Sequence, residues 1–154
     1  MVIYIGADHK GFELKAELKE FIQGLGYQVF DMGAETLDEG DDYPGFAAAV
    51  AEKVSNEYEN ARGIVICGSG VGVDIVANKF PRVRSSLVST SDQAFDARND
   101  DDANVLALGA NYVRSDDVKR ILTTWLGTPF SGEERHRRRR DKISKIEIEL
   151  QEKS

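Results

Sequence analysis

The residue types that could carry chemistry gather in one stretch, GIVICGSGVG at residues 63–72. Its apolar run, Ile64 to Ile66, ends in the only cysteine, Cys67, which is followed at once by glycines that alternate with Ser69 and a valine. A short β-branched run closed by glycine predicts a strand buried on both faces, as in parallel sheets. Residues 73–80 then have a helical composition. We therefore expect Cys67 and Ser69 at the carboxyl end of an inner strand, beside the start of a helix.

Cys67 has two interpretations at such a position. A single cysteine is more often a small core residue than a nucleophile. Open parallel sheets, however, bind ligands outside the carboxyl ends of their strands, and a nearby helix amino terminus favours the reactive thiolate. The backbone N–H groups of the glycine-rich turn can bind a phosphate or a developing oxyanion, although a plain tight turn is the alternative. The turn has neither GxGxxG spacing nor the Lys-Ser/Thr of a P-loop, so it is not a nucleotide-binding motif.

Two further groups are expected near this edge of the sheet. Asp8 and His9 directly follow the first predicted strand, which places them beside Cys67; the alternative is an aspartate that caps the first helix and a histidine on a surface loop. Asp100 to Asp102 lie at the end of a predicted helix, which we also expect near this edge; the alternative is a solvated turn before the last strand.

The run Arg135 to Arg140 contains two arginines, Arg135 and Arg139, that are four residues apart and share one face of a helix. With His136 beside them they could clamp a phosphate group. The alternatives are a solvated helix face and a nucleic-acid patch. The formal net charge of −7 disfavours nucleic acid as the partner.

Strands alternate with helices along the whole chain, which predicts an α/β domain with three layers and a parallel sheet. We expect a single domain over residues 1–154. Ser91 or Asp92, and Ser115, are the predicted caps of two helices. The tail from Gly132 predicts a last helix whose narrow apolar stripe must pack on something, often another subunit. The strands are predicted at residues 2–5, 27–30, 64–67, the second half of 84–88, and 105–108.

Composition restricts the remaining classes. No apolar run approaches the roughly 20 residues needed to span a bilayer, and the amino terminus lacks the pattern of a signal peptide, so we expect a cytoplasmic protein with no membrane partner. One cysteine cannot form an internal disulfide, and no Cys/His pair has metal-ligand spacing, so no metal is expected.

Several stretches together resemble one family: ADHKGFELK, DYPGFA, ICGSGVGVDIVANKFPRVR, NVLALG and GEERHRRRRDKISKIE. By these motifs the chain is identified as a member of the ribose-5-phosphate isomerase B family, which includes the galactose-6-phosphate isomerase subunits. The resemblance implies a Rossmann-like α/β/α sandwich without metal or cofactor. It implies a homodimer, or a dimer of dimers, with active sites shared across the interface. It also implies aldose–ketose isomerisation of a sugar phosphate through a cis-enediolate, most simply D-ribose 5-phosphate to D-ribulose 5-phosphate in the pentose phosphate pathway.

The resemblance also implies residue roles. Cys67 resembles the base that moves a proton between C2 and C1, and Ser69 the hydroxyl residue that helps move protons between O1 and O2. Asp8 resembles a sugar-hydroxyl contact. The implied anion hole consists of amides in the turn formed by Gly68, Gly70, Val71 and Gly72. The implied phosphate ligands are His9, Arg135 and Arg139, the last two reaching the site of the partner subunit, with His136 beside them.

Three positions depart from the family pattern. Asp100 and Asp101 replace a usual His-Asn pair, and Asn111 replaces a common arginine. The missing histidine is the residue credited with ring opening, a task that Asp100 could take over as an acid or base. Asp101 would stand beside the enediolate, and Asn111 removes a phosphate ligand. Other hypotheses are therefore another aldose phosphate, an unphosphorylated sugar, or a non-catalytic protein that binds sugar phosphates.

Overall fold

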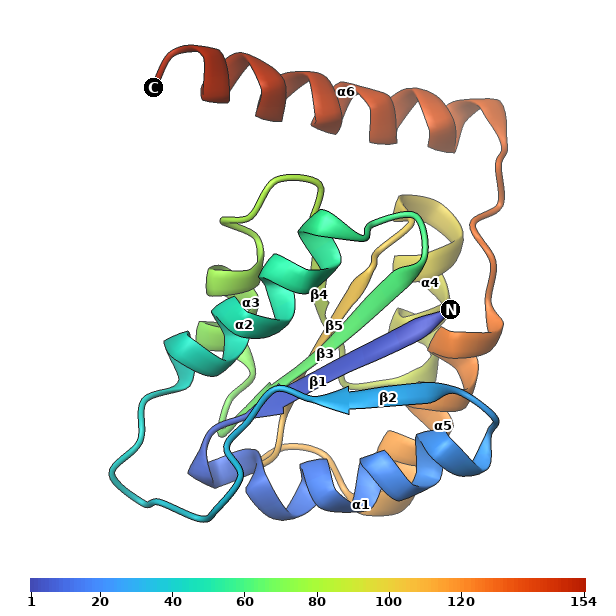
Figure 1. Cartoon of the computed structure of the whole chain (residues 1–154). Helices are drawn as coiled ribbons and strands as arrows, with labels where there is room; N and C mark the ends of the chain where they lie inside the picture. Colours follow the sequence, from blue (N-terminus) through green and yellow to red (C-terminus); the bar gives the residue numbers. More distant parts are fainter.

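The computed structural model describes residues 1–154 and contains a five-stranded sheet in which every neighbouring pair of strands is parallel. The strand order is β2-β1-β3-β5-β4, so β1, β3 and β5 are inner strands (Figure 1). All five predicted strands are confirmed. The strands are β1 (Val2–Ala7), β2 (Gln28–Asp31), β3 (Ala61–Cys67), β4 (Ser85–Leu87) and β5 (Val105–Gly109). The helices are the 3-10 turn η1 (His9–Gly11), α1 (Phe12–Gly24), α2 (Tyr43–Asn56), α3 (Val71–Ala77), α4 (Ser91–Asp101), α5 (Ser115–Gly127) and α6 (Glu134–Glu152).

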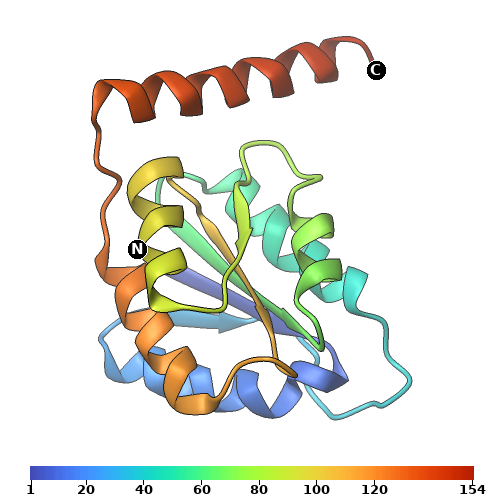
Figure 2. The same ribbon diagram turned by 180° about the vertical axis from the view of Figure 1, so that it is seen from behind.

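Helices cover both faces of the sheet, which confirms the predicted three-layer sandwich (Figures 1 and 2). One buried cluster joins α1, α4 and α5 to the sheet and contains Trp125, and a second joins α2 and α3 to the opposite face. The alternation along β3 builds both clusters at once. Ile64 and Ile66 belong to the first cluster, whereas Val65 and Cys67 belong to the second. Cys67 is therefore part of the core on the α2–α3 side, at the end of the central strand.

Two helix caps differ from the sequence expectation. The cap of α4 is Thr90 and not Ser91, because the Thr90 hydroxyl accepts a hydrogen bond from the Gln93 N–H at 3.1 Å. Ser115 is the first residue of α5, and its hydroxyl donates to the Glu17 carboxylate of α1 and not to its own helix. A neighbouring side chain thus captures a hydroxyl that local preference assigns to a cap.

The last helix, α6, lies across the amino-terminal edge of the sheet, outside the three layers of the sandwich (Figures 1 and 2). Its predicted apolar stripe is exposed to solvent: Ile143, Ile146 and Leu150 are 46%, 57% and 63% exposed. The face that α6 turns to the body is mainly polar instead, with Asp141 and Glu147 among its residues. None of the helices combines the length and apolar composition that crossing a bilayer requires.

Candidate active site

The carboxyl ends of β1, β3 and β5 meet at one edge of the sheet, as predicted. The Asp8 N–H donates to the Ile66 carbonyl at 3.3 Å, and the Asn111 N–H donates to the Gly68 carbonyl at 2.9 Å. Gly11 allows this approach, because a Cβ atom at residue 11 would lie 2.5 Å from Cγ2 of Ile66. The turn η1 therefore rests directly on β3, which brings Asp8 and His9 next to the strand end that carries Cys67.

Cys67 is 5% exposed and is the last residue of β3. Its Sγ accepts a hydrogen bond of 3.2 Å from the Gly70 N–H. Gly70 has φ of +78°, and a Cβ there would lie 2.5 Å from Cδ1 of Leu87 and 2.8 Å from the Gly109 nitrogen. Glycine is required at this position, since an L side chain fits neither the backbone conformation nor the space. The turn thereby aims an N–H donor at the sulfur.

Ser69 is exposed, and its hydroxyl accepts a hydrogen bond of 3.2 Å from the Val71 N–H. The hydroxyl hydrogen is left available to a ligand. Two of the four turn residues expected to bind an anion, Gly70 and Val71, thus direct their amides at Cys67 and Ser69. In this structure the turn organises the thiol and the hydroxyl, and the two side chains share one short segment.

Tyr43, the first residue of α2, forms a wall that the sequence interpretation did not assign to the site. Its ring lies against Gly72, where any Cβ would overlap the ring atoms. Tyr43 is 36% exposed, so the ring and its hydroxyl reach the surface beside the glycine turn. The signal in the sequence was the DYPGFA stretch, which belongs to the resemblance but had no residue-level explanation.

His9 pairs with Asp41, a second residue that sequence reasoning missed. One Asp41 oxygen, Oδ1, accepts from the His9 backbone N–H at 2.9 Å and lies 2.8 Å from Nδ1 of the ring. The hydrogen bond to Asp41 raises the pKa of His9 above its ordinary value, because it favours the imidazolium. The His9 side chain is 24% exposed, so the pair borders the open edge of the site.

Asp8 is almost fully buried and caps η1 through one carboxylate oxygen. Its Oδ1 accepts from the Lys10 N–H at 3.0 Å and from the Gly11 N–H at 3.3 Å. Asp8, His9 and Asp41 also form the group whose ligand atoms lie within 4.8 Å of one another and could hold a metal ion. Two of these three side chains already satisfy each other by a hydrogen bond.

Asp100 and Asp101 lie at the opposite edge of the sheet, so the expectation that they adjoin Cys67 within one chain was wrong. Helix α4 ends at Asp101 and leads into the amino-terminal end of β5, whereas Cys67 pairs with Gly109 at the carboxyl end of that strand. The reason is the crossover connection, since a helix between parallel strands must return the chain to the edge where the next strand starts.

The arginine run starts α6 at this second edge. Arg135 and Arg139 are exposed, but His136 is only 5% exposed. Its Nδ1 lies 2.6 Å from Oγ of Ser131, and its Nε2 lies 3.6 Å from Oδ1 of Asp100. His136 therefore does not share the exposed surface of Arg135 and Arg139. It points into the body, where Ser131 and Asp100 contact its ring.

Fold and site together define an α/β/α sandwich with three groups at the carboxyl edge of its sheet: a thiol under an N–H donor, an exposed hydroxyl and a His–carboxylate pair. The family model for ribose/galactose isomerases matches residues 3–143. The chain belongs to this family.

Curated relatives and solved structures agree. The chain is 40% identical to a probable ribose-5-phosphate isomerase B of Mycoplasma genitalium, over 97% of both chains. It is 40% identical to ribose-5-phosphate isomerase B of Escherichia coli, over 94% of this chain and 95% of that one. The crystal structure of the Mycoplasma genitalium enzyme with bound ribulose-5-phosphate superposes with a TM-score of 0.93, at 40% identity over 96% and 97% of the two chains. The Clostridium thermocellum enzyme gives a TM-score of 0.91, at 43% identity over 97% and 99%.

Proposed function

We propose that this chain is an aldose–ketose isomerase that interconverts D-ribose 5-phosphate and D-ribulose 5-phosphate. The observation that carries the proposal is the Cys67 thiol beneath the Gly70 N–H, at the end of the central strand. Family membership supports it, as does a relative of matching fold and length with ribulose-5-phosphate bound. The reaction belongs to the pentose phosphate pathway, and the cytoplasm is its expected location.

Cys67, as the thiolate, removes the proton from C2 of the open-chain aldose, and the electron pair forms the enediolate. The same thiol then returns the proton to C1, which completes the ketose. Ser69 moves a proton between O1 and O2, using the hydroxyl hydrogen that its bond to Val71 leaves free. The turn amides that do not bond to Cys67 or Ser69 stabilise the developing oxyanion. A positioned base beside preorganised donors is what abstraction of a carbon-bound proton requires.

His9 binds the phosphate as an imidazolium, and Asp41 keeps it charged. One carboxylate oxygen of Asp8 caps η1, and the other accepts a hydrogen bond from a sugar hydroxyl. Tyr43 covers the glycine turn and limits access of water from that side. These roles rest on the arrangement of the side chains around one strand edge.

The second half of the site comes from a partner copy. Asp100, Asp101, Arg135 and Arg139 lie on the far edge of their own sheet, so only another subunit can bring them to Cys67. Exposed apolar residues support a homodimer through the β4 edge: Val71, Ile75, Leu87 and Phe95. The outward stripe of α6 offers a further contact, which a dimer of dimers would bury.

A second candidate function keeps the reaction but changes the substrate. Asn111 occupies the surface beside the glycine turn, with its N–H bonded to Gly68, where the family commonly has an arginine. A site with fewer cations would favour another aldose phosphate or an unphosphorylated sugar. A panel of aldoses decides between them by the ranking of kcat/KM and not by the presence of activity.

The test compares the wild type with Cys67→Ala on D-ribose 5-phosphate. Turnover by the wild type and a loss of about 10²-fold or more in a folded Cys67→Ala variant is the expected result. Full activity of the variant would refute the mechanism. Thermal stabilisation by sugar phosphate without any turnover would instead identify a non-catalytic binding protein.

A further inference from the structure

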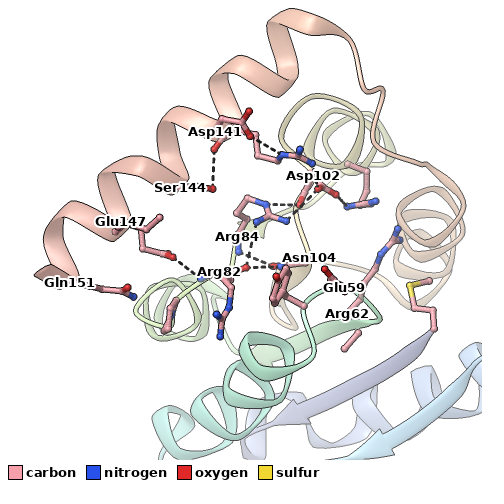
Figure 3. A pocket seen from close by; sticks show the side chains of 17 residues that line it. Glu59, Arg62, Arg82, Arg84, Asp102, Asn104, Asp141, Ser144, Glu147 and Gln151 are labelled. Atoms are coloured by element: carbon pink, nitrogen blue, oxygen red, sulfur yellow. Dashed lines mark hydrogen bonds and ion pairs between the residues drawn. The ribbon is translucent and has the colours of Figure 1, made fainter.

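A cavity of about 690 Å³ lies between α6 and the amino-terminal edge of the sheet (Figure 3). This is the end of the molecule opposite Cys67, which is the last residue of β3. Its floor is made by residues at the amino-terminal ends of the strands, such as Ala61, the first residue of β3, and Asn104, which precedes β5. Its roof is the inner face of α6. A volume of this size accommodates a small metabolite. The proposed isomerase mechanism makes no use of it.

Three arginines at one end of the cavity share a single carboxylate, that of Asp102. Arg98 lies 2.9 Å from Oδ1, while Arg140 and Arg84 lie 2.8 Å and 3.4 Å from Oδ2. Burial alone would raise the pKa of Asp102, but hydrogen bonds from Arg98 and Arg140 hold it below the ordinary value. Asp141 is the only other carboxylate in ion-pair contact with these three arginines, at 3.8 Å from Nε of Arg140, so three positive charges face two negative ones.

Arg62 adds a fourth cation without a carboxylate of its own. Its Nη1 donates to the carbonyls of Trp125 and Leu126 at 3.1 Å and 3.5 Å, and its guanidinium lies 5.3 Å from the Trp125 ring centroid. Burial, and then the charge of Arg98, lower the pKa of Arg62 to about 10. These buried and partly buried guanidiniums repel one another, and an added anion would relieve that repulsion.

The remaining lining is rich in acceptors. Glu59 comes from the loop before β3, and Asp141, Ser144 and Glu147 come from α6. Glu147 already accepts from the Arg82 N–H at 2.8 Å, and the Ser144 hydroxyl donates to the Arg140 carbonyl at 3.3 Å. Carboxylates here would repel a second phosphate but would accept hydrogen bonds from hydroxyl groups. The cavity therefore has a cationic end for an anion and an acceptor-rich wall for hydroxyls.

We propose that this cavity is a second binding site, for a small hydroxylated phosphate ester. Its phosphate lies among Arg62, Arg98 and Arg140, because guanidinium forks match phosphate oxygens, and its hydroxyls face Glu59 and α6. A bound ester connects α4, which carries Arg98, to α6, which carries Arg140.

The test uses adenosine 5′-monophosphate, which cannot isomerise because its C1 is fixed in a glycosidic bond, and inorganic phosphate alone. Trp125, the only tryptophan, stacks beside Arg62 and reports on this end of the molecule. We expect saturable binding of the nucleotide by calorimetry, with a matching change in Trp125 fluorescence, and weaker binding of phosphate.

Matched variants locate the binding. Arg62→Met keeps the aliphatic length and should weaken nucleotide binding about tenfold or more, the loss expected for a charge-assisted hydrogen bond. Arg120→Gln, which removes an exposed arginine paired with Asp117, should leave the affinity unchanged. If Arg62→Met fails to fold, Arg140→Gln replaces it, with the same expected loss.

His9→Ala separates this site from the proposed active site and should retain nucleotide binding. No saturable change at millimolar nucleotide would overturn the proposal. Loss of binding in His9→Ala with unchanged binding in Arg62→Met would also overturn it, because the ligand would then sit at the carboxyl edge. Neither result depends on turnover, so each is independent of the isomerase proposal.

Discussion

Asp41 holds His9 by two hydrogen bonds to the same carboxylate oxygen, one from the backbone N–H at 2.9 Å and one involving the ring Nδ1 at 2.8 Å. The other oxygen of Asp41 is buried without a partner. A buried carboxylate in this state favours a positive charge on its neighbour. The loop before α2 therefore fixes both the orientation and the charge of His9.

Asp41→Asn should lower the pKa of His9, because the neutral amide no longer favours the imidazolium. The pKa of His9 is raised in the folded wild type. The stabilisation from its imidazolium is therefore fully present below the unfolded-state pKa of about 6.5 and is lost as pH rises through the folded-state pKa. In the variant this loss occurs at lower pH, so KM for sugar phosphate should rise several-fold near neutrality. NMR titration of the ring protons measures the pKa of His9, with His136→Gln to assign the signals, and steady-state kinetics measure KM. Equal pKa values for His9 in both proteins would contradict the prediction.

Gly70→Ala should destabilise the chain and impair the thiol. The added methyl meets Leu87 and the Gly109 backbone, and φ of +78° disfavours any L side chain, which together cost about 2–4 kcal/mol. Relaxation of the turn also withdraws the N–H from Cys67, so kcat should fall more than KM changes. The matched control is Gly24→Ala, at the end of α1 with nothing within 4 Å, which should be neutral or stabilise by up to about 1 kcal/mol. Denaturant unfolding of both variants tests the difference, and equal stabilities would refute it.

The Lys15–Asp31 pair should govern stability in acid. Lys15 is 2% exposed, and its Nζ donates to Asp31 Oδ1 at 2.9 Å and to the Ala34 carbonyl. Burial raises the pKa of Asp31, but the hydrogen bond from Lys15 and others lower it below the ordinary value. The stability from this depressed pKa is present above the unfolded value of about 3.9 and is lost as pH falls through the folded value.

Asp31→Asn should therefore cost about 2–3 kcal/mol at pH 7, because it leaves a buried ammonium without its counter-charge. It should also flatten the loss of stability that the wild type shows as pH falls from about 5 through the folded-state pKa of Asp31, where its carboxylate becomes protonated. Urea unfolding at several pH values gives both quantities. Parallel curves for the two proteins would show that the pair does not contribute to acid sensitivity.

Mixing two inactive variants should restore activity if active sites are shared between copies. Cys67→Ala and Arg139→Ala each remove a residue from every site, but a mixed dimer keeps one intact site with Cys67 from one chain and Arg139 from the other. Random exchange should recover about a quarter of the wild-type activity. Refolding the two variants together and separately measures it. A mixture as inactive as its components would place both residues in the same chain's site.

Local sequence was sufficient wherever one segment determines the geometry. The alternation of Ile64, Val65 and Ile66 identified a strand buried on both faces, and the glycines after Cys67 identified its end. Asp41 escaped prediction because its loop meets η1 only through the path of the folded chain. Asp100 was misplaced although a parallel sheet was predicted, because the helix that precedes a parallel strand ends at the edge where that strand starts, opposite the carboxyl ends.

The inward face of α6 is charged while its apolar stripe points outward, so ion pairs such as Arg140 with Asp102 attach the helix to its own chain. Apolar burial stabilises the sheet and depends little on ionic strength. The ion pairs are partly exposed, so salt weakens them; the Debye length is about 8 Å at physiological ionic strength. Concentrated salt should thus release the carboxyl-terminal helix from the body while the sandwich stays folded. The attachment of α6 depends on ionic strength, and the stability of the sandwich does not.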